Sequence, residues 1–361
     1  MFIDTVPDAR NIAIKMQYDI ATLPEDQSYM PRIADERVGY FENGHLNFSG
    51  DNTFSKDLNY IARWNLKPGH PVTYYLSNTI PARYRQPVRE ALLAWNGPFS
   101  RIGVPNAVIV KDQPTDPSFD PDDIRYNVVR WLSEKQGGFA EAQLLYNPYT
   151  GEMIKSGIVI DSDLMRFGKF DYPVLVQPQV ADAAADGAPS RARLSALGAN
   201  EYLSGERSNY TFGISALAIV GAANGYAVPE RFSNEFLKSI VLHESGHDFG
   251  LRHNFIGSEA YTARQLQDPN FVRAHGVANS VMEYSPINLW PKGTRQGGYF
   301  QTTFGPYDYY AIQYGYAPIG GARTPQDELP TLRRWAAAWT QPQFRYASDE
   351  DVSWGNGMGV D

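Results

Sequence analysis

Residues 243 to 253 read His243-Glu244-Ser245-Gly246-His247-Asp248-Phe249-Gly250-Leu251-Arg252-His253. Three of the six histidines in this 361-residue chain therefore fall within eleven positions. Residues four apart on a helix lie on the same face about one turn apart, so the first two imidazoles can aim at one point. The preceding residues, 231–242, carry apolar side chains at helical spacing, which predicts a helix that begins after a Ser233 N-cap and continues through both histidines.

Gly250 predicts where this helix ends. A residue without Cβ can adopt a positive φ and stop a helix sharply, after which the chain turns back. His253 would then reach the point that His243 and His247 share. Three neutral histidines can hold zinc at about 2.0–2.1 Å and leave a fourth position for water, which is typical of a catalytic zinc site. The alternative is a polar helix face with capping histidines, which the glycine and the third histidine in register make less attractive.

Glu244 follows the first of these histidines and is expected to project beside the metal rather than onto it. Zinc lowers the pKa of its bound water to about 7. A carboxylate within hydrogen-bond reach can take the proton as the water attacks a carbonyl, and can later deliver it to the leaving amine. Glu244 is therefore the predicted general base.

The extended pattern H-E-x-x-H-x-x-G-x-x-H resembles the zinc motif of the metzincin metallopeptidases. Downstream, Met282 lies in a segment similar to the Met-turn of that family, where a methionine packs beneath the three histidines. Tyr284 stands where the astacin and serralysin branches have a tyrosine near the metal. The resemblance implies that its phenol approaches zinc or hydrogen-bonds the tetrahedral oxyanion. A purely structural role stays open, because the chain has 23 tyrosines.

Three further segments, residues 30–41, 123–131 and 247–254, resemble the large bacterial zinc-dependent metalloproteases with a metzincin-like domain, first catalogued as domains of unknown function. Those proteins are usually longer on both sides, so the resemblance implies that this chain is a partial one. It also favours a periplasmic or secreted location, although no signal peptide is visible at the N-terminus.

The predicted order of elements is strand, helix, strands, zinc helix and final helix, with the first long helix over residues 81–102. This order favours an α+β fold, a metzincin-like (zincin) catalytic domain whose mixed, twisted sheet has its helices mainly on one face. We expect that domain to span residues 66–318, with an insertion-like stretch at 178–230. A β-rich segment, residues 1–65, precedes it, and a truncated C-terminal extension, residues 319–361, follows it.

The N-terminal segment has a competing interpretation as a pro-segment that blocks the metal. With no cysteine in the chain, the blocking group would have to be a carboxylate such as Asp35 or Glu36.

Residues 140–146 and 152–160 flank a turn-rich stretch and predict a hairpin-like pair of strands. In metzincins an edge strand of the sheet binds the peptide substrate as an added strand. The resemblance places that edge near Gly138, Ala140 and Ala142, which are the predicted substrate-binding residues.

Composition excludes several classes of protein. The chain is 43% hydrophobic and 13% aromatic, which is typical of a globular protein. Its formal net charge of −8 argues against nucleic acid as a partner. No apolar run approaches the 18 or more residues that a membrane span requires. The absence of cysteine excludes disulfides and zinc–thiolate sites.

Two acidic clusters, residues 116–123 and the pair Asp161 and Asp163, could in principle supply oxygen ligands to Ca²⁺. Neither matches the calcium-loop pattern D-x-[DN]-x-[DN]-G. Solvated acidic loops are the preferred interpretation, and zinc is the one metal that a motif supports.

The leading functional hypothesis is a zinc-dependent endopeptidase that hydrolyses peptide bonds by Glu244-assisted attack of zinc-bound water, with a peptide or protein as its substrate. A second hypothesis is a zinc-stabilised module that binds peptide or glycan without catalysis. Glu244 argues against it, because a structural site needs no base. A zinc amidase acting on cell-wall peptides would use the same chemistry, so the sequence does not separate it from a peptidase.

Overall fold

A five-stranded sheet forms the centre of the protein. The computed structural model describes residues 2–5, 13–16, 18–23, 28–47, 56–133, 139–165, 230–291, 294–348 and 351. The strand order in this sheet is β6-β5-β7-β9-β8. Four strands run parallel and the fifth, β8, pairs antiparallel with β9. Their bounds are β5 Val72–Leu76, β6 Val108–Asp112, β7 Asn127–Leu132, β8 Ala140–Tyr146 and β9 Met153–Asp161.

The strands show the alternation that a sheet covered by helices requires. Along β5 the side chains of Val72, Tyr74 and Leu76 are buried, while those between them are half-buried. Successive residues of a strand point to opposite faces, so this pattern places one face of β5 in the core. Together with the antiparallel β8, it confirms the predicted mixed sheet of an α+β fold.

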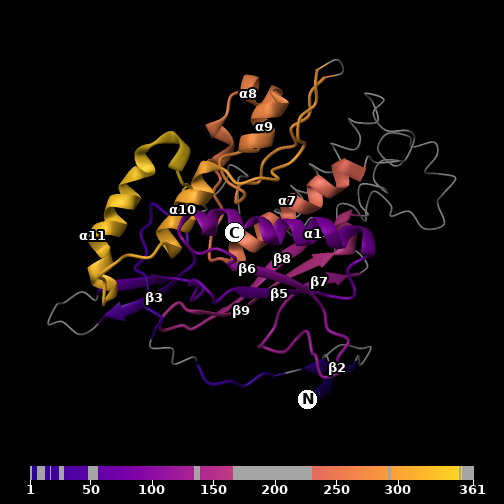
Figure 1. Cartoon of the computed structure of the whole chain (residues 1–361). Coiled ribbons are helices and arrows are strands. Elements are labelled where there is room, and N and C mark those ends of the chain that lie inside the picture. Colours follow the sequence, from indigo (N-terminus) through magenta and orange to yellow (C-terminus); the bar gives the residue numbers. More distant parts are fainter. Residues whose placement is uncertain are drawn as a thin grey trace.

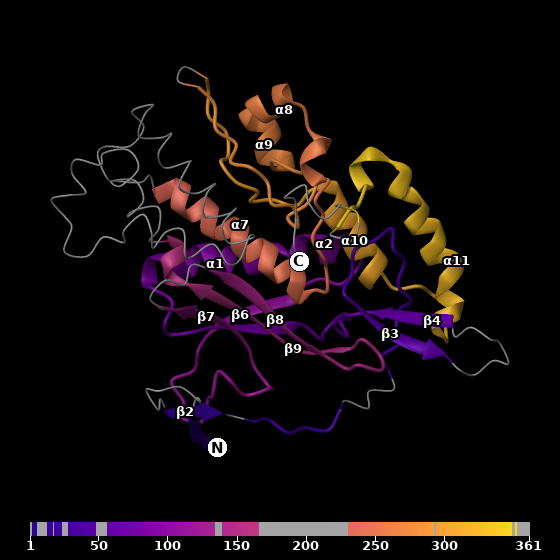
Figure 2. The ribbon, with the colours of Figure 1, turned by 180° about the vertical axis from the view of Figure 1, so that it is seen from behind.

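Two long helices cover that face of the sheet: α1, Ala82–Ala94, and α7, Glu230–Asp248 (Figures 1 and 2). The helix predicted over residues 81–102 is two helices, because the chain breaks at Trp95 and continues as α2, Asn96–Arg101. Trp95 is fully buried and its indole Nε1 donates to Ser245 Oγ on α7 at 2.7 Å. The break has a local cause, because Pro98 has no N–H to bond the carbonyl of Ala94.

The predicted N-cap of the zinc helix is wrong. α7 already includes Glu230, so Ser233 lies within the helix. The physical reason is apolar packing at its start: Phe232 is fully buried, and its ring lies 5.2 Å from Tyr299 and 5.0 Å from Phe300 between centroids. Burying that ring favours helical residues before the serine.

Smaller elements surround this core. The hairpin of β3, Glu42–Asn47, and β4, Lys56–Ile61, is antiparallel, as is the pair β1, Phe2–Thr5, and β2, Ala13–Met16. The β2 strand lies on the side of the sheet away from α1 and α7 (Figures 1 and 2). After α7 come η2 Gly257–Ala260, α8 Ala263–Gln267, α9 Pro269–His275, α10 Pro306–Tyr316, α11 Pro325–Ala336, η3 Ala337–Thr340 and η4 Pro342–Phe344.

Some predictions concern residues outside the described part of the chain. They include Gly138 and, except for Glu230, the insertion-like stretch 178–230. Within the described part, none of the helices combines the length and the apolar character needed to cross a bilayer.

Candidate metal centre

α7 and the turn that follows it bring the three histidines together. His243 and His247 lie one turn apart on α7, and both are buried. Gly250 follows with φ +86°, so the helix ends where the sequence predicts. The chain then turns, and His253, also buried, comes back to the first two. One ring nitrogen from each histidine lies within 4.8 Å of the others.

Backbone carbonyls orient two of the rings. His243 Nδ1 lies 2.9 Å from Val281 O, and His247 Nδ1 lies 2.7 Å from Leu251 O. A carbonyl only accepts, so each Nδ1 carries the proton and each Nε2 keeps its lone pair for a ligand. His247 Nε2 lies 3.1 Å from His253 Nε2. A tetrahedral zinc with bonds of about 2.0–2.1 Å holds two nitrogens about 3.3 Å apart, so the spacing suits a shared metal.

The three histidines are neutral at pH 7. Burial lowers the pKa of His247 to about 4. Burial, and then the nearby His247, hold the pKa of His243 and of His253 well below the usual 6.5. Metal binding requires the neutral imidazole. The histidines are therefore suited to bind zinc, because all three are neutral and the tautomers of His243 and His247 leave Nε2 unprotonated.

Met282 packs against the zinc helix between the two helical ligands. It is fully buried, and a Cβ added at Gly246 would lie 2.2 Å from its sulfur. Only glycine leaves room for the methionine at that turn of the helix. Met282 thus packs at Gly246 on the zinc helix, and its role beneath a bound metal stays a prediction.

Asp308 holds the Met-turn from the first turn of α10. Its carboxylate accepts from Ser280 Oγ at 2.7 Å and from Val281 N at 3.1 Å, and it also accepts from Gly305 N at 2.8 Å. Val281 O in turn receives the His243 Nδ1 proton. Asp308 is therefore linked to the ligand His243 through Val281. Its position near a helix N-terminus alone did not predict this role.

Of the two predicted catalytic side chains, Tyr284 contacts the histidine triad. Tyr284 Oη hydrogen-bonds His253 Nε2, and its ring centroid lies 4.5 Å from that of His253 and 5.0 Å from that of His243. Glu244 is buried on α7 directly after His243 and is not one of the three converging ligands. Tyr284 therefore lies against a predicted ligand, while the position of the Glu244 carboxylate beside the metal stays a prediction.

Comparison with known proteins agrees with this geometry. Residues 225–359 match the family model described as Met-zincin. We call residues 225–359 the Met-zincin region. Residues 4–69 match a domain of unknown function (DUF5117). Neither the curated proteins nor the solved structures gave a match. The match confirms the predicted metzincin resemblance and, with the histidine triad, supports zinc as the metal.

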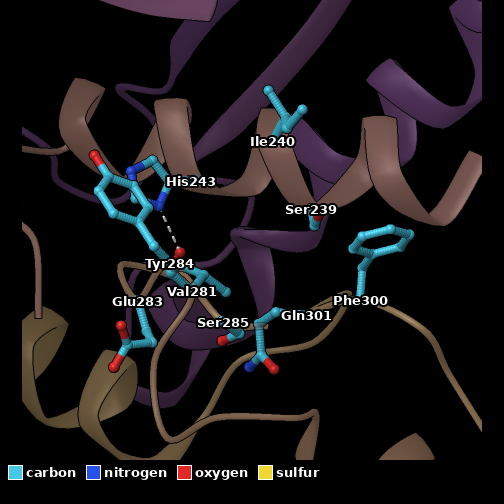
Figure 3. Close-up of a pocket in the computed structure, with 9 residues that line it drawn as sticks. All are labelled: Ser239, Ile240, His243, Val281, Glu283, Tyr284, Ser285, Phe300 and Gln301. Atoms are coloured by element: carbon cyan, nitrogen blue, oxygen red, sulfur yellow. Dashed lines mark hydrogen bonds between the residues drawn. The ribbon is translucent and has the colours of Figure 1, made fainter. Parts of the chain in front are cut away.

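A small pocket opens beside His243 in the Met-zincin region. Its volume is about 30 Å³. Figure 3 shows the zinc helix on one side and the Met-turn and the Phe300 segment on the other. Ser285 Oγ is buried and has no hydrogen-bond partner among the described residues. The residues that line the pocket are Ser239, Ile240, His243, Val281, Glu283, Tyr284, Ser285, Phe300 and Gln301.

The predicted substrate strand lies at an edge of the sheet, next to the zinc helix of the Met-zincin region. β8 pairs only with β9 in the five-stranded sheet of the described residues, and α7 packs against it. Ala140 and Ala142 pair with Ile160 and Ile158 of β9. Gly138, the third predicted residue, lies outside the described part of the chain.

The acidic clusters do not converge on a cation site. Asp116 accepts from Ser118, Asp123 pairs with Arg125 at 2.6 Å, and Asp161 accepts from the backbone N–H of Asp163. Among the described residues, the histidine triad is the one group of three or more such side chains with converging ligand atoms. The local hydrogen bonds of the cluster at residues 116–123 favour its interpretation as a solvated loop. That interpretation is wrong for Asp161, which is fully buried at the end of β9.

Proposed function

We propose that this chain is a zinc-dependent endopeptidase. The observation that carries the proposal is the convergence of three buried, neutral histidines with a carboxylate on the same helix, Glu244. Zinc bound by these histidines would act as a Lewis acid on a substrate carbonyl and on water. Glu244 has no counterpart in a purely structural site, which favours catalysis over a binding module.

Glu244 moves the proton in this proposal. Its carboxylate accepts one proton from the attacking water as the new C–O bond forms. It then delivers that proton to the amide nitrogen as the C–N bond breaks, so one water is consumed and one peptide bond is cleaved. The burial of Glu244 strengthens its interaction with charge that develops nearby, because the local dielectric is low.

The substrate is a peptide or protein in an extended conformation. β8 has no second partner strand among the described residues, so its outer edge near Ala140 and Ala142 can pair with the substrate backbone, as sheet edges do in peptide recognition. The pocket beside His243 is close enough to the triad to receive a side chain next to the bond that is cleaved.

Metal removal tests this function. Chelation should abolish peptide hydrolysis, and zinc should restore it, while the chelated chain still melts cooperatively because its apolar core does not include the metal. A chain that loses its fold on chelation, and that hydrolyses no peptide when zinc-loaded, would instead support the zinc-stabilised binding module.

Tyr284→Phe tests the second catalytic assignment. The phenol lies at His253 Nε2, where it can donate to a developing oxyanion. We expect kcat to fall by about 100-fold, the loss typical of one oxyanion donor, with KM and zinc content nearly unchanged. Unchanged kcat would leave Tyr284 with a structural role only.

A further inference from the structure

The turn between the second and third histidines is bound by a distant part of the chain, residues 38–42, which we call the clamp segment. Tyr40 forms an antiparallel bridge with Leu251. Phe41 N donates to Gly250 O at 2.8 Å, and Arg252 N donates to Gly39 O at 3.1 Å. The turn that delivers His253 is thus hydrogen-bonded on one side to the clamp segment.

The next stretch of the N-terminal region closes on the same turn. Ala62 N donates to Phe41 O at 2.7 Å, so residue 62 is hydrogen-bonded to the clamp segment. A Cβ added at Gly250 would lie 1.9 Å from Ala62 O. Glycine is therefore required at position 250 for two reasons: its backbone has a positive φ, and Ala62 O approaches too closely for a Cβ.

Phe41 also touches a ligand directly. Its ring centroid lies 5.6 Å from that of His247, with the planes 45° apart. His247 Nδ1 donates to Leu251 O, and Leu251 is the bridge partner of Tyr40. The clamp segment therefore reaches His247 both through a ring contact and through the carbonyl that fixes its tautomer.

The clamp segment is itself anchored to α10 and to the C-terminal region. Gly39 N donates to Tyr307 Oη at 2.9 Å, and Tyr40 Oη donates to Ala311 O at 2.7 Å. Tyr40 is fully buried, and a Cβ added at Gly39 would overlap the ring of Tyr346. Because the clamp segment is anchored by these contacts, its hydrogen bonds can hold the turn before His253 in one position.

We propose that the clamp segment is a positioning element of the metal centre, with Phe41 as the side chain that holds His247. Its residues fall in the region that matches the domain of unknown function, whereas the ligands fall in the Met-zincin region. The N-terminal region thus contributes to zinc affinity rather than blocking the metal. Asp35, a candidate blocking group, is paired with Arg37 at 2.6 Å.

Zinc affinity of the full-length Phe41→Ala variant tests the proposal, measured by competition with a chromophoric chelator. We expect the Kd for zinc to rise by about 10–100-fold, the loss typical of removing a group that supports a ligand from outside. The d–d absorption bands of the cobalt-substituted protein should shift as well. Phe41→Leu, which keeps an apolar side chain, should recover most of the affinity. None of these measurements depends on hydrolysis, so they stand apart from the test of the proposed function.

Phe344→Ala is the matched control. Phe344 is half-buried, as Phe41 is, and its ring centroid lies 5.1 Å from that of Tyr310. It differs from Phe41 in that its aromatic neighbour is not a metal ligand. It should lower the melting temperature of the metal-free protein and leave the Kd for zinc unchanged. The proposal is overturned if Phe41→Ala binds zinc within 2-fold of the wild type, or if Phe344→Ala weakens zinc equally. If Phe41→Ala fails to fold, Phe41→Leu takes its place in the same comparison. We then expect the Kd for zinc to rise by about 3-fold, and an unchanged Kd would contradict the proposal.

Discussion

Phe300 forms the end wall of the pocket beside His243 (Figure 3). Its ring lies 5.0 Å from that of Phe232 and 5.2 Å from that of Phe236, both fully buried on α7. Contacts with both rings restrain Phe300 from turning away to enlarge the pocket. The pocket is therefore narrow, and we expect it to admit a small side chain.

Phe300→Ala should change which peptides are cleaved. The wild type should prefer a small side chain next to the cleaved bond. The variant should gain about 10-fold or more in kcat/KM for peptides with leucine or phenylalanine there, because each added methylene that fits contributes severalfold. Competitive cleavage of a peptide series by mass spectrometry measures this. Phe119→Ala, a truncation among other aromatic rings, is the control and should leave the preference unchanged. An unaltered preference in Phe300→Ala would mean that this pocket does not select the substrate.

At the level of single residues, the zinc motif predicted the ligands because it is local in sequence. Helical spacing places His243 and His247, and one glycine explains the return of His253. Contacts made by residues far away in the chain were missed. Trp95 donates to Ser245 across a separation of 150 residues, and no spacing rule connects an isolated tryptophan to the zinc helix.

Gly250 ends α7, and its replacement should weaken both metal binding and general stability. An alanine there would meet both a φ of +86° and Ala62 O at 1.9 Å. Gly321 has φ +85° and open space around its Cβ position, so Gly321→Ala isolates the backbone cost of about 1–2 kcal/mol. Gly250→Ala should cost more than this in chemical denaturation and should bind zinc at least about 10-fold more weakly. Equal effects of the two substitutions would show that the close approach is unimportant.

Asp308 links α10 to the Met-turn and should make stability depend on pH. Burial raises the pKa of Asp308 to about 7, and its hydrogen bonds with Ser280, Gly305 and Val281 act in the opposite direction. The folded protein then holds this proton more tightly than the unfolded chain does. The contribution is fully present below about pH 4 and is lost as the pH rises to about 7. It is on the order of 4 kcal/mol.

Asp308→Asn removes this titration. The variant should be less stable overall, because its amide cannot accept all of the same hydrogen bonds. Its free energy of unfolding should nevertheless decline less than that of the wild type between pH 4 and pH 7, as measured by urea denaturation at a series of pH values. Parallel curves for the two proteins would contradict the assignment.

At the level of elements, the hairpin and the mixed sheet followed from local patterns. The hairpin has turn chemistry between two apolar runs, and β8 and β9 form it. The early start of α7 did not follow, since it depends on the packing of Phe232 against Phe300 from another part of the chain. The break before α2 was missed although Pro98 signals it locally. Sequence patterns predict the kind of element better than its ends, because tertiary packing decides the ends.

Across the whole molecule, a buried ion pair joins the N-terminal region to α11. Arg32 donates to Glu328 at 2.6 and 2.9 Å, and both side chains are nearly inaccessible to solvent. Arg32 also donates to Tyr314 O at 2.7 Å. These residues lie 296 positions apart, and sequence spacing cannot reveal such a contact. The predicted domain boundaries at residues 65 and 318 stay predictions, and this ion pair crosses both.

Glu328→Ala should destabilise the whole chain. Removing one partner leaves a buried guanidinium uncompensated, which costs about 3–5 kcal/mol. Both regions that match family models should unfold together in one transition, seen by circular dichroism and by tryptophan fluorescence. Asp112→Ala, which breaks exposed pairs with Arg85 and Arg89, is the control and should cost about 1 kcal/mol or less. Similar losses in the two variants would mean that the buried pair does not unite the regions.

Digestion of a diverse peptide library tests the central claim most directly. The zinc-loaded wild type and Glu244→Ala are compared by mass spectrometry, with zinc content measured on the same samples. The wild type should cleave internal peptide bonds, and Glu244→Ala should keep its zinc while cleaving at least about 100-fold more slowly. A folded, zinc-loaded wild type that cleaves nothing, or a variant that cleaves at the wild-type rate, would contradict the assignment of a Glu244-dependent zinc endopeptidase.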